Sequence, residues 1–267
     1  MNVDAALRKI AADYKRLNKE QQKQIVRTFE RSMADVYELL AAYEEPDGTI
    51  KRTRISKLLR ELDEVERRMR DDGISAFKRV IVEETSEWAA AKVAAIAGVA
   101  LTAAYLARVR TRVERDVFRR PEKDGLWLSD RIWAVAGNVR DELAKTIRES
   151  VIRGESVSNI ISKIRRVYEM ETWKIERLAR TEGSTAFRSA TLENARQSKH
   201  VKWVRFHEGT CGRPDHHRHN CYHLAREDRH DQGTGIFKTT DTDILMPHPN
   251  CTSWISYVIE REEGVDA

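Results

Sequence analysis

Residues 200–224 read HVKWVRFHEGTCGRPDHHRHNCYHL, and residues 244–258 read ILMPHPNCTSWISYV. All eight histidines and all three cysteines of the 267-residue chain lie between His200 and Cys251, beside turn formers and not on a helical stripe. Imidazole and thiolate are ligands that Zn²⁺ prefers, and a small loop-rich module often needs such a cross-link. The sequence therefore predicts a compact C-terminal module, held by a metal or by a polar network, on a helical scaffold.

The residues on both sides of this segment have the pattern of β-strands. Apolar and charged residues alternate over residues 201–206, and residues 254–259 form a second short apolar run. Two such strands would bracket the His/Cys-rich segment. Their pairing would bring Cys211 near His248 and Cys251.

Helical periodicity dominates the rest of the chain. A first helix ends at residues 45–48 (EPDG), because proline forbids continuation and Asp-Gly suits a tight turn. A second helix has a narrow apolar seam, with a break or kink expected at residues 71–73 (DDG). Residues 74–118 are predicted to form one or two long helices through an Ala-rich segment. Residues 121–125 (PEKDG) are the clearest linker, and further helices follow up to residue 197.

The predicted fold class is mainly α, with long N-terminal helices followed by a small C-terminal α+β module. Three consecutive regions are expected. They are a long-helix scaffold and interaction region (residues 1–120), a second helical region (residues 121–199) and the His/Cys-rich module (residues 200–267).

Composition limits the kinds of protein that fit this chain. Charged residues make up 34%, with only twelve Gly and five Pro, which is typical of long exposed helices. The formal net charge of +5 is compatible with a polyanionic neighbour without indicating one. Three cysteines are an odd number, so a disulfide framework is not expected. The most apolar stretch, residues 93–106, is shorter than the roughly 20 residues that span a bilayer, and the N-terminus lacks the apolar core of a signal peptide.

One face of a predicted helix carries four arginines: Arg108, Arg112, Arg115 and Arg119. Such a stripe can contact the phosphates of DNA. It can equally be a solvated face that is partly paired with Glu114 and Asp116. We favour the solvated face.

Several short motifs in the second half of the chain resemble one protein family. Residues 154–158 (GESVS) open a helix, residues 180–182 (RTE) lie in a later one, and residues 247–251 read PHPNC after the strand and the turn. In this order they resemble the C-terminal region of the phage Mu F-like minor head proteins, also called phage head morphogenesis proteins. The resemblance covers roughly residues 151–258.

The resemblance implies a bacteriophage virion protein, a minor capsid protein present in few copies. Such proteins associate with the portal protein and join capsid or scaffold proteins while the procapsid is assembled in the host cytoplasm. Some lie inside the head near packaged double-stranded DNA. On this resemblance we expect a non-enzymatic, oligomeric or assembly-dependent protein of the head interior or portal region, with no membrane partner.

The RTE motif consists of Arg180, Thr181 and Glu182. It could form a contact with the portal or with a second copy of the chain. Alternatively, Arg180 and Glu182 could tie their helix to the C-terminal module through hydrogen-bonded charge pairs. We favour this second, structural interpretation.

The zinc-type ligand set of the family is incomplete here. Many members have Cys-x-x-Cys at the first turn, where this chain has Pro214 three residues after Cys211. Many also end in a further cysteine, where this chain has Ser253 after Cys251. Other members have Arg-x-x-His at the first turn, and residues 213–216 fit that version.

Local replacements can complete a structural zinc shell of three thiolates and one imidazole. The best set is Cys211, Cys221, His248 and Cys251, with His216 and His223 as substitutes. Such a site would be closed, with no open coordination position. In the alternative, the histidines bond to turn carbonyls and the cysteines pack as small apolar residues. Structural zinc is the only cofactor that the sequence indicates.

The same histidines permit an enzymatic alternative. A His-Asn-His-type nuclease needs a histidine base and a metal held by further ligands, in a strand–strand–helix frame. The candidates are His216, His217, His219, Asn220, His223 and His230. The sequence indicates strands but no following helix with the last ligand. We therefore expect no enzyme, and a nuclease or a non-catalytic DNA-binding protein remains the alternative.

Overall fold

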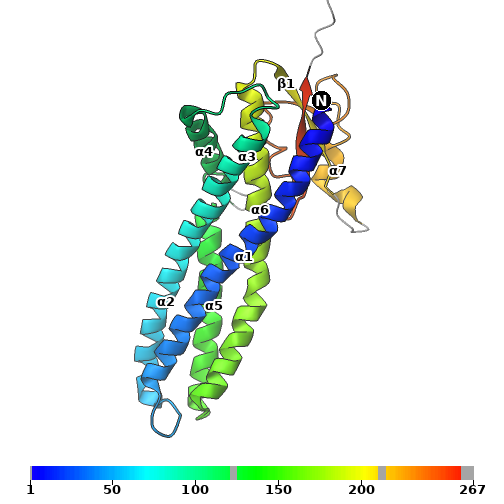
Figure 1. Ribbon diagram of the computed structural model, residues 1–267. Helices are drawn as coiled ribbons and strands as arrows, with labels where there is room; N and C mark the ends of the chain where they lie inside the picture. Colours follow the sequence, from blue (N-terminus) through cyan, green and yellow to red (C-terminus); the bar gives the residue numbers. More distant parts are fainter. Residues whose placement is uncertain (1, 121–124, 210–214, 260–267) are drawn as a thin grey trace, which may run out of the picture. The chain divides into compact units, whose positions relative to one another are not determined.

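The computed structural model describes residues 2–120, 125–209 and 215–259 of the chain. It confirms the predicted fold class, because long helices precede a small module with a three-stranded antiparallel sheet (Figure 1). The helical elements before the module are α1 (Val3–Tyr43), η1 (Arg52–Arg54), α2 (Ile55–Ala76), η2 (Phe77–Glu84), α3 (Thr85–Val93), α4 (Ala103–Phe118), α5 (Leu128–Ile152) and α6 (Val157–Gln197). Among the described residues, no helix combines the length and the apolar character that crossing a bilayer requires.

The C-terminal module consists of short elements: β1 (Val201–His207), η3 (His216–Arg218), α7 (Asn220–Leu224), β2 (Ile236–Lys238) and β3 (Trp254–Ile259). The two predicted strands are β1 and β3, and they pair antiparallel, with Val204 opposite Tyr257 and His207 opposite Trp254. The strand β2 was not predicted. It pairs with the other edge of β1, so the sheet order is β2-β1-β3.

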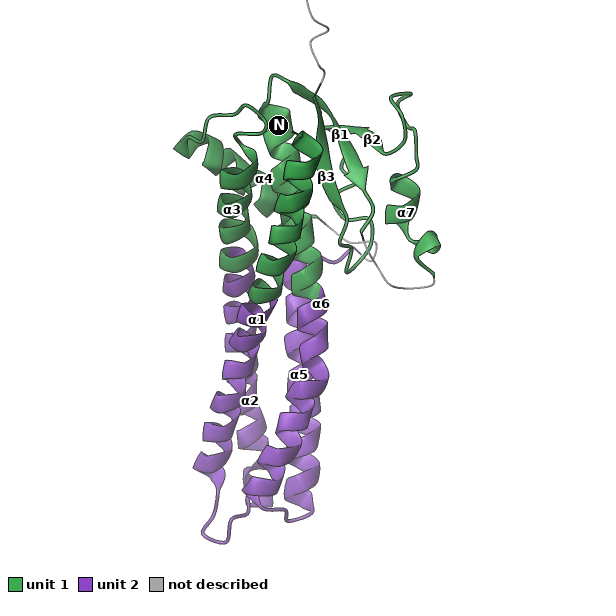
Figure 2. Cartoon of the chain, turned by 45° about the vertical axis from the view of Figure 1, so that its right-hand side comes forward, with its two compact units in different colours: residues 1–21, 79–120, 178–267 green, residues 22–78, 121–177 purple. Residues whose placement is uncertain are grey.

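The chain divides into two compact units, and neither is continuous in sequence (Figure 2). Unit 1 comprises residues 1–21, 79–120 and 178–267, and unit 2 comprises residues 22–78 and 121–177. The two longest helices, α1 and α6, contribute to both units. This division differs from the three consecutive regions drawn from the sequence, because long helices extend from one unit into the next.

Two sequence predictions concern the first two helices: the end of α1 is confirmed, and the break expected in α2 is wrong. The helix α1 ends before Pro46, as predicted. The helix α2, in contrast, does not break at residues 71–73 and continues to Ala76. A Cβ atom at Gly73 would lie 2.9 Å from Phe29 Cζ and 3.0 Å from Ile132 Cγ2. The glycine therefore serves close helix packing and not a change of direction.

The irregular part of this helical stretch is η2, a π-helix between α2 and α3. The wider turn of a π-helix leaves backbone carbonyls available to other donors. Within unit 1, the Gln21 side chain donates to the carbonyl of Val80 (2.8 Å) and to the hydroxyl of Thr85 (3.0 Å). Gln21 is fully buried. It interrupts the apolar seam of α1 because it bonds to this carbonyl.

The Ala-rich segment is not helical throughout, which corrects a further expectation. The helix α3 ends at Val93, residues 94–98 form turns, and α4 begins only at Ala103. Gly98 adopts the left-handed conformation (φ 67°), which glycine tolerates best. Thr102 then caps α4 by accepting a hydrogen bond from the backbone amide of Tyr105.

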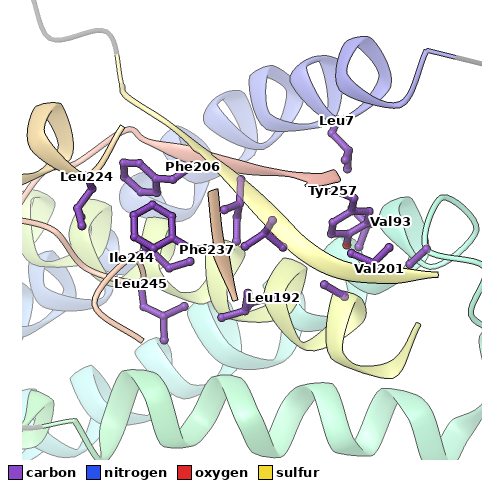
Figure 3. Packing of buried hydrophobic residues seen from close by; sticks show 14 of the residues in the cluster. Leu7, Val93, Leu192, Val201, Phe206, Leu224, Phe237, Ile244, Leu245 and Tyr257 are labelled. Atoms are coloured by element: carbon purple, nitrogen blue, oxygen red, sulfur yellow. The ribbon is translucent and has the colours of Figure 1, made fainter. Parts of the chain in front are cut away.

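The sheet packs its inner face on helical residues of unit 1 (Figure 3). Side chains from α1, α3 and α6 meet the strands and the segment before β3, as the cluster formed by Leu7, Val93, Leu192, Val204, Phe206, Phe237, Ile244, Leu245 and Tyr257 shows. Cys221 and Cys251 belong to the same buried cluster. The two cysteines are thus part of a hydrophobic core of unit 1.

Candidate metal centre

Two short segments bring the cysteines and histidines together. The helix α7 follows directly after His219 and carries Cys221 in its first turn. The loop before β3 carries His248 and Cys251, and Asn250 turns it with a positive φ of 61°. Both cysteines are free thiols and almost completely buried.

The sulfur of Cys221 lies at the centre of the donor atoms. His248 Nε2 is 3.0 Å from Cys221 Sγ, and His216 Nε2 is 3.4 Å from the same sulfur. The donor atoms of Cys221, His248 and Cys251 all lie within 4.8 Å of one another, and so do those of His216, His219 and Cys221. The two triads share Cys221, so each triad adds two further donor residues near this sulfur.

The orientation of His248 suits a ligand. Its Nδ1 lies 2.9 Å from the carbonyl oxygen of Pro249, so Nδ1 carries the proton and donates to that oxygen. This tautomer leaves the lone pair of Nε2 directed at Cys221. Metal-binding histidines almost always donate their second ring N–H in this way.

The charges around Cys251 favour its thiolate. The hydrogen bond from Cys221 is the main cause that lowers the pKa of Cys251 far below its ordinary value, and His248 and Arg188 act in the same direction. Burial opposes them. The same contact with Cys251 raises the pKa of His248. The thiolate is the form of cysteine that binds metals.

A buried arginine joins the loop to helix α6. Arg188 is only 1% exposed. Its Nε donates to the carbonyl of Leu245 (2.7 Å), and its Nη1 donates to the carbonyl of Ser253 (2.8 Å). The hydroxyl of Ser253 lies 3.0 Å from the sulfur of Cys251. No sequence motif had pointed to Arg188, because an arginine within a helix usually indicates a solvated face.

The RTE motif lies beside this loop. The backbone amide of Asn250 donates to the hydroxyl of Thr181 (3.0 Å). Glu182 is fully buried and forms an ion pair with Arg120 (3.1 Å), whose guanidinium also contacts the sulfur of Met246 (2.9 Å). Thr181 and Glu182 thus connect α6 to the loop.

The third residue of the motif, Arg180, is placed differently. Its side chain is exposed, and its carbonyl accepts a 3.4 Å hydrogen bond from Asn18. Thr181 and Glu182 therefore provide described connections to the loop.

Four of the six proposed ligands belong to the two triads: Cys221 is shared, His248 and Cys251 complete one triad, and His216 lies in the other. His223 is exposed and belongs to neither triad. Cys211 lies outside the described residues. His219 was missing from the proposed set, although its spacing from His216, with two residues between them, is one that metal sites use.

The arginine stripe is engaged in local contacts in the folded chain. Arg112 pairs with Asp116 at 2.7 Å, Arg115 lies 3.5 Å from the same carboxylate, and Arg108 donates to Gln197. Arg119 forms the C-terminal cap of α4. Asp116 is thus one of the partners that the sequence indicated, and both the solvated-face and the DNA-contacting interpretations of the stripe stay predictions.

The frame that a His-Asn-His nuclease needs is not present in the described part of the chain. The five-residue helix α7 lies between β1 and β2 in the sequence, and no helix follows the strand pair up to Ile259. His230 bonds to Asp241 at 2.8 Å and lies beside the ring of Trp203, outside both triads.

Comparisons with known proteins identify no relative of this chain. No family model, curated protein or solved structure matches it.

Proposed function

We propose that this chain is a phage minor head protein that acts in head morphogenesis and associates with the portal. The observation that supports this proposal is the meeting of its two motifs. The RTE and PHPNC motifs are far apart in the sequence, yet Thr181 accepts a hydrogen bond from the backbone of Asn250. Two motifs that resemble one family thus depend on each other in the fold, which an accidental resemblance would not require.

The proposal assigns the two units different tasks. Unit 1 contains the cross-linked module, and unit 2 contains helices with exposed apolar side chains. Trp127, Trp133, Met170 and Trp173 are between 45% and 70% exposed. Scattered exposed apolar residues are common, but aromatic side chains are enriched at protein interfaces. We propose that the long helices meet portal, capsid or scaffold proteins.

A structural zinc ion is part of the proposal, held by Cys221, Cys251, His248 and one of His216 and His219. Zinc–nitrogen and zinc–sulfur bonds of about 2.0 and 2.3 Å imply ligand atoms about 3.4–3.8 Å apart in a tetrahedron. The 3.0 and 3.4 Å contacts at Cys221 are close to this spacing. The ion would cross-link α7 and the loop before β3.

A polar network alone explains these residues less completely. The single S–H of Cys221 can donate either to His248 or to Cys251, and His216 can donate to the Cys221 sulfur. His219 Nδ1, however, is buried without a hydrogen-bond partner in the described part of the chain. Buried polar atoms are nearly always paired, so an unpaired nitrogen in an imidazole that is grouped with the Cys221 thiol favours a bound cation.

Metal content tests the zinc site on protein purified without a histidine tag. We expect about one zinc per chain, and less than about half an equivalent would contradict the site. Three variants make the test specific. At least one of His216→Ala and His219→Ala should weaken zinc binding, whereas His223→Ala, in the same short segment but exposed, should not. An equal loss in His223→Ala would contradict the proposed geometry.

Co-purification with the portal tests the biological role. The chain should be retained on portal rings when it is co-expressed with the portal protein of the same genome, and it should be present at low copy number in mature virions. Retention on a capsid protein alone, or absence from virions by mass spectrometry, would count against the proposal. Metal-dependent nicking of plasmid DNA that is lost in His216→Ala would favour the nuclease instead.

A further inference from the structure

We propose that Arg188 positions the loop of residues 245–253 on helix α6, so that His248 and Cys251 are in place before the metal binds. This inference rests on the proposed zinc site and adds the residue that organises two of its ligands. Arg188 contacts no metal itself. It acts through the backbone of the segment that carries the ligands.

The geometry of the guanidinium carries the inference. Arg188 Nε bonds to the carbonyl of Leu245, and Nη1 bonds to the carbonyl of Ser253. These two carbonyls lie on opposite sides of His248 and Cys251 in the sequence. The guanidinium is a rigid planar fork, so it fixes both ends of the loop at once.

Two further contacts lie closer to the ligands. Arg188 Nη1 is 3.5 Å from the carbonyl oxygen of Cys251 and 3.3 Å from the hydroxyl of Ser253. That hydroxyl reaches the sulfur of Cys251 at 3.0 Å. The path from the guanidinium to a proposed zinc ligand therefore contains one intervening side chain.

The electrostatics point to the same role. Arg188 is completely buried, and it forms no ion pair with a carboxylate among the described residues. A buried guanidinium stays charged and requires compensation. Here the compensation comes from carbonyl dipoles of the loop, and thiolate ligands would add negative charge beside it. A residue needed only for packing would not require a charged group in this core.

Two substitutions separate charge from geometry. Arg188→Lys keeps the positive charge but loses the fork that reaches both carbonyls, and Arg188→Met removes both. The matched control is Tyr257→Phe, which deletes the 3.0 Å bond from the buried Tyr257 hydroxyl to the carbonyl of Thr191. That bond also joins the module to α6, but it does not involve the ligand loop.

The first measurement is zinc affinity by chelator competition on the full chain. Loss of a residue that orients metal ligands typically weakens binding about 10- to 100-fold, which we expect for Arg188→Met, with a smaller loss for Arg188→Lys. Tyr257→Phe should bind like wild type. Cobalt-loaded protein adds a second readout, because the thiolate-to-cobalt absorption should fall in Arg188→Met as Cys251 leaves the metal.

The second measurement needs no metal. In zinc-free wild type the buried Cys251 should react slowly with an alkylating reagent, as peptide mass spectrometry can follow. In both Arg188 variants the reaction should be faster, while Tyr257→Phe stays slow. Circular dichroism shows which variants fold. If Arg188→Met does not fold, the zinc affinity and Cys251 reactivity of Arg188→Lys test the inference.

The outcomes distinguish this inference from the proposed function. Wild type that binds no zinc removes the site and this inference with it. Wild type that binds zinc, together with folded Arg188 variants of unchanged affinity and unchanged Cys251 reactivity, overturns the inference alone. Weaker affinity and faster labelling in the Arg188 variants, but not in Tyr257→Phe, support it.

Discussion

At the scale of single residues, the pKa of one histidine in the sheet makes the stability of the fold depend on pH. His207 stacks on Trp254 with ring centroids 3.8 Å apart, and its Nε2 lies 2.8 Å from the hydroxyl of Ser256. Burial lowers the pKa of His207 to about 4. The imidazole is therefore neutral in the folded chain at pH values where the unfolded chain already binds a proton.

The sign of the resulting pH dependence follows. Above the unfolded pKa of about 6.5, the neutral His207 does not lower the free energy of unfolding. As the pH falls from there towards 4, the unfolded chain binds a proton that the folded chain does not, so the free energy of unfolding falls by an amount on the order of 2 kcal/mol. Urea unfolding at pH 7 and pH 4.5, with a chelator present, should show this loss in wild type and less of it in His207→Gln. The exposed His217→Gln should behave like wild type. Identical pH profiles for the His207 variant and wild type would refute the assignment.

The buried carboxylate of the RTE motif gives a second prediction at this scale. Removing one partner of a buried ion pair leaves the other charge uncompensated, so Glu182→Ala should lower the free energy of unfolding by about 3 kcal/mol. The control is Glu208→Ala, which removes the more exposed pair with Arg226 and should cost less than about 1 kcal/mol. Thermal melts of both variants provide the measurement. An unchanged melting temperature in Glu182→Ala would mean that the motif does not stabilise the fold.

At the scale of elements, two glycines in unit 2 test how closely the helices pack. Ala has the higher helix propensity, by about 1 kcal/mol. At Gly73 the new Cβ would lie 2.9 Å from Phe29 and 3.0 Å from Ile132, so Gly73→Ala should destabilise by about 1–3 kcal/mol. At Gly137 the nearest atom is Glu66 Oε1 at 3.5 Å, so Gly137→Ala should be neutral or stabilising. Denaturant unfolding gives the free energy of unfolding of the two variants in parallel. Equal changes in both variants would argue against close packing at Gly73.

Gly73 also illustrates which features of the helices could be predicted from the sequence and which could not. A helix that buries one apolar stripe is visible in the sequence, as the confirmed end of α1 before Pro46 illustrates. Gly73 looks like a helix breaker until its neighbours from other helices are known. The strand β2 has three residues, which are too few for a periodic signal, and it exists because β1 offers a free edge.

The candidate site was predictable only in part, for a similar reason. Cysteine and histidine are uncommon outside functional sites, so their clustering pointed to Cys221, His248 and Cys251. The choice between His219 and His223 depends on how the chain enters a five-residue helix, because His219 directly precedes α7 and His223 lies on its exposed side. Arg188 could not be found from the sequence at all, because its role arises from carbonyls that only the folded loop presents.

At the scale of the whole molecule, the two units should respond differently to loss of zinc. A ligand that binds only the folded state stabilises it by about 2.7 kcal/mol at a hundredfold excess over its dissociation constant. The proposed ligands all belong to unit 1, whereas the contacts between α2 and α5 belong to unit 2. Because each unit has its own core, a chelator should lower the local stability of unit 1 and leave that of unit 2 unchanged.

Hydrogen exchange resolves this difference along the chain. With a chelator, amide exchange in β1, β3 and residues 245–253 should become faster, and exchange in α2 and α5 should stay the same. Added zinc should restore the slow exchange in wild type but not in His248→Ala, while the exposed His223→Ala should recover fully. A uniform increase over both units would mean that the ion stabilises the chain as one cooperative body, since local opening follows local stability. No change anywhere would mean that the polar network alone holds the module together.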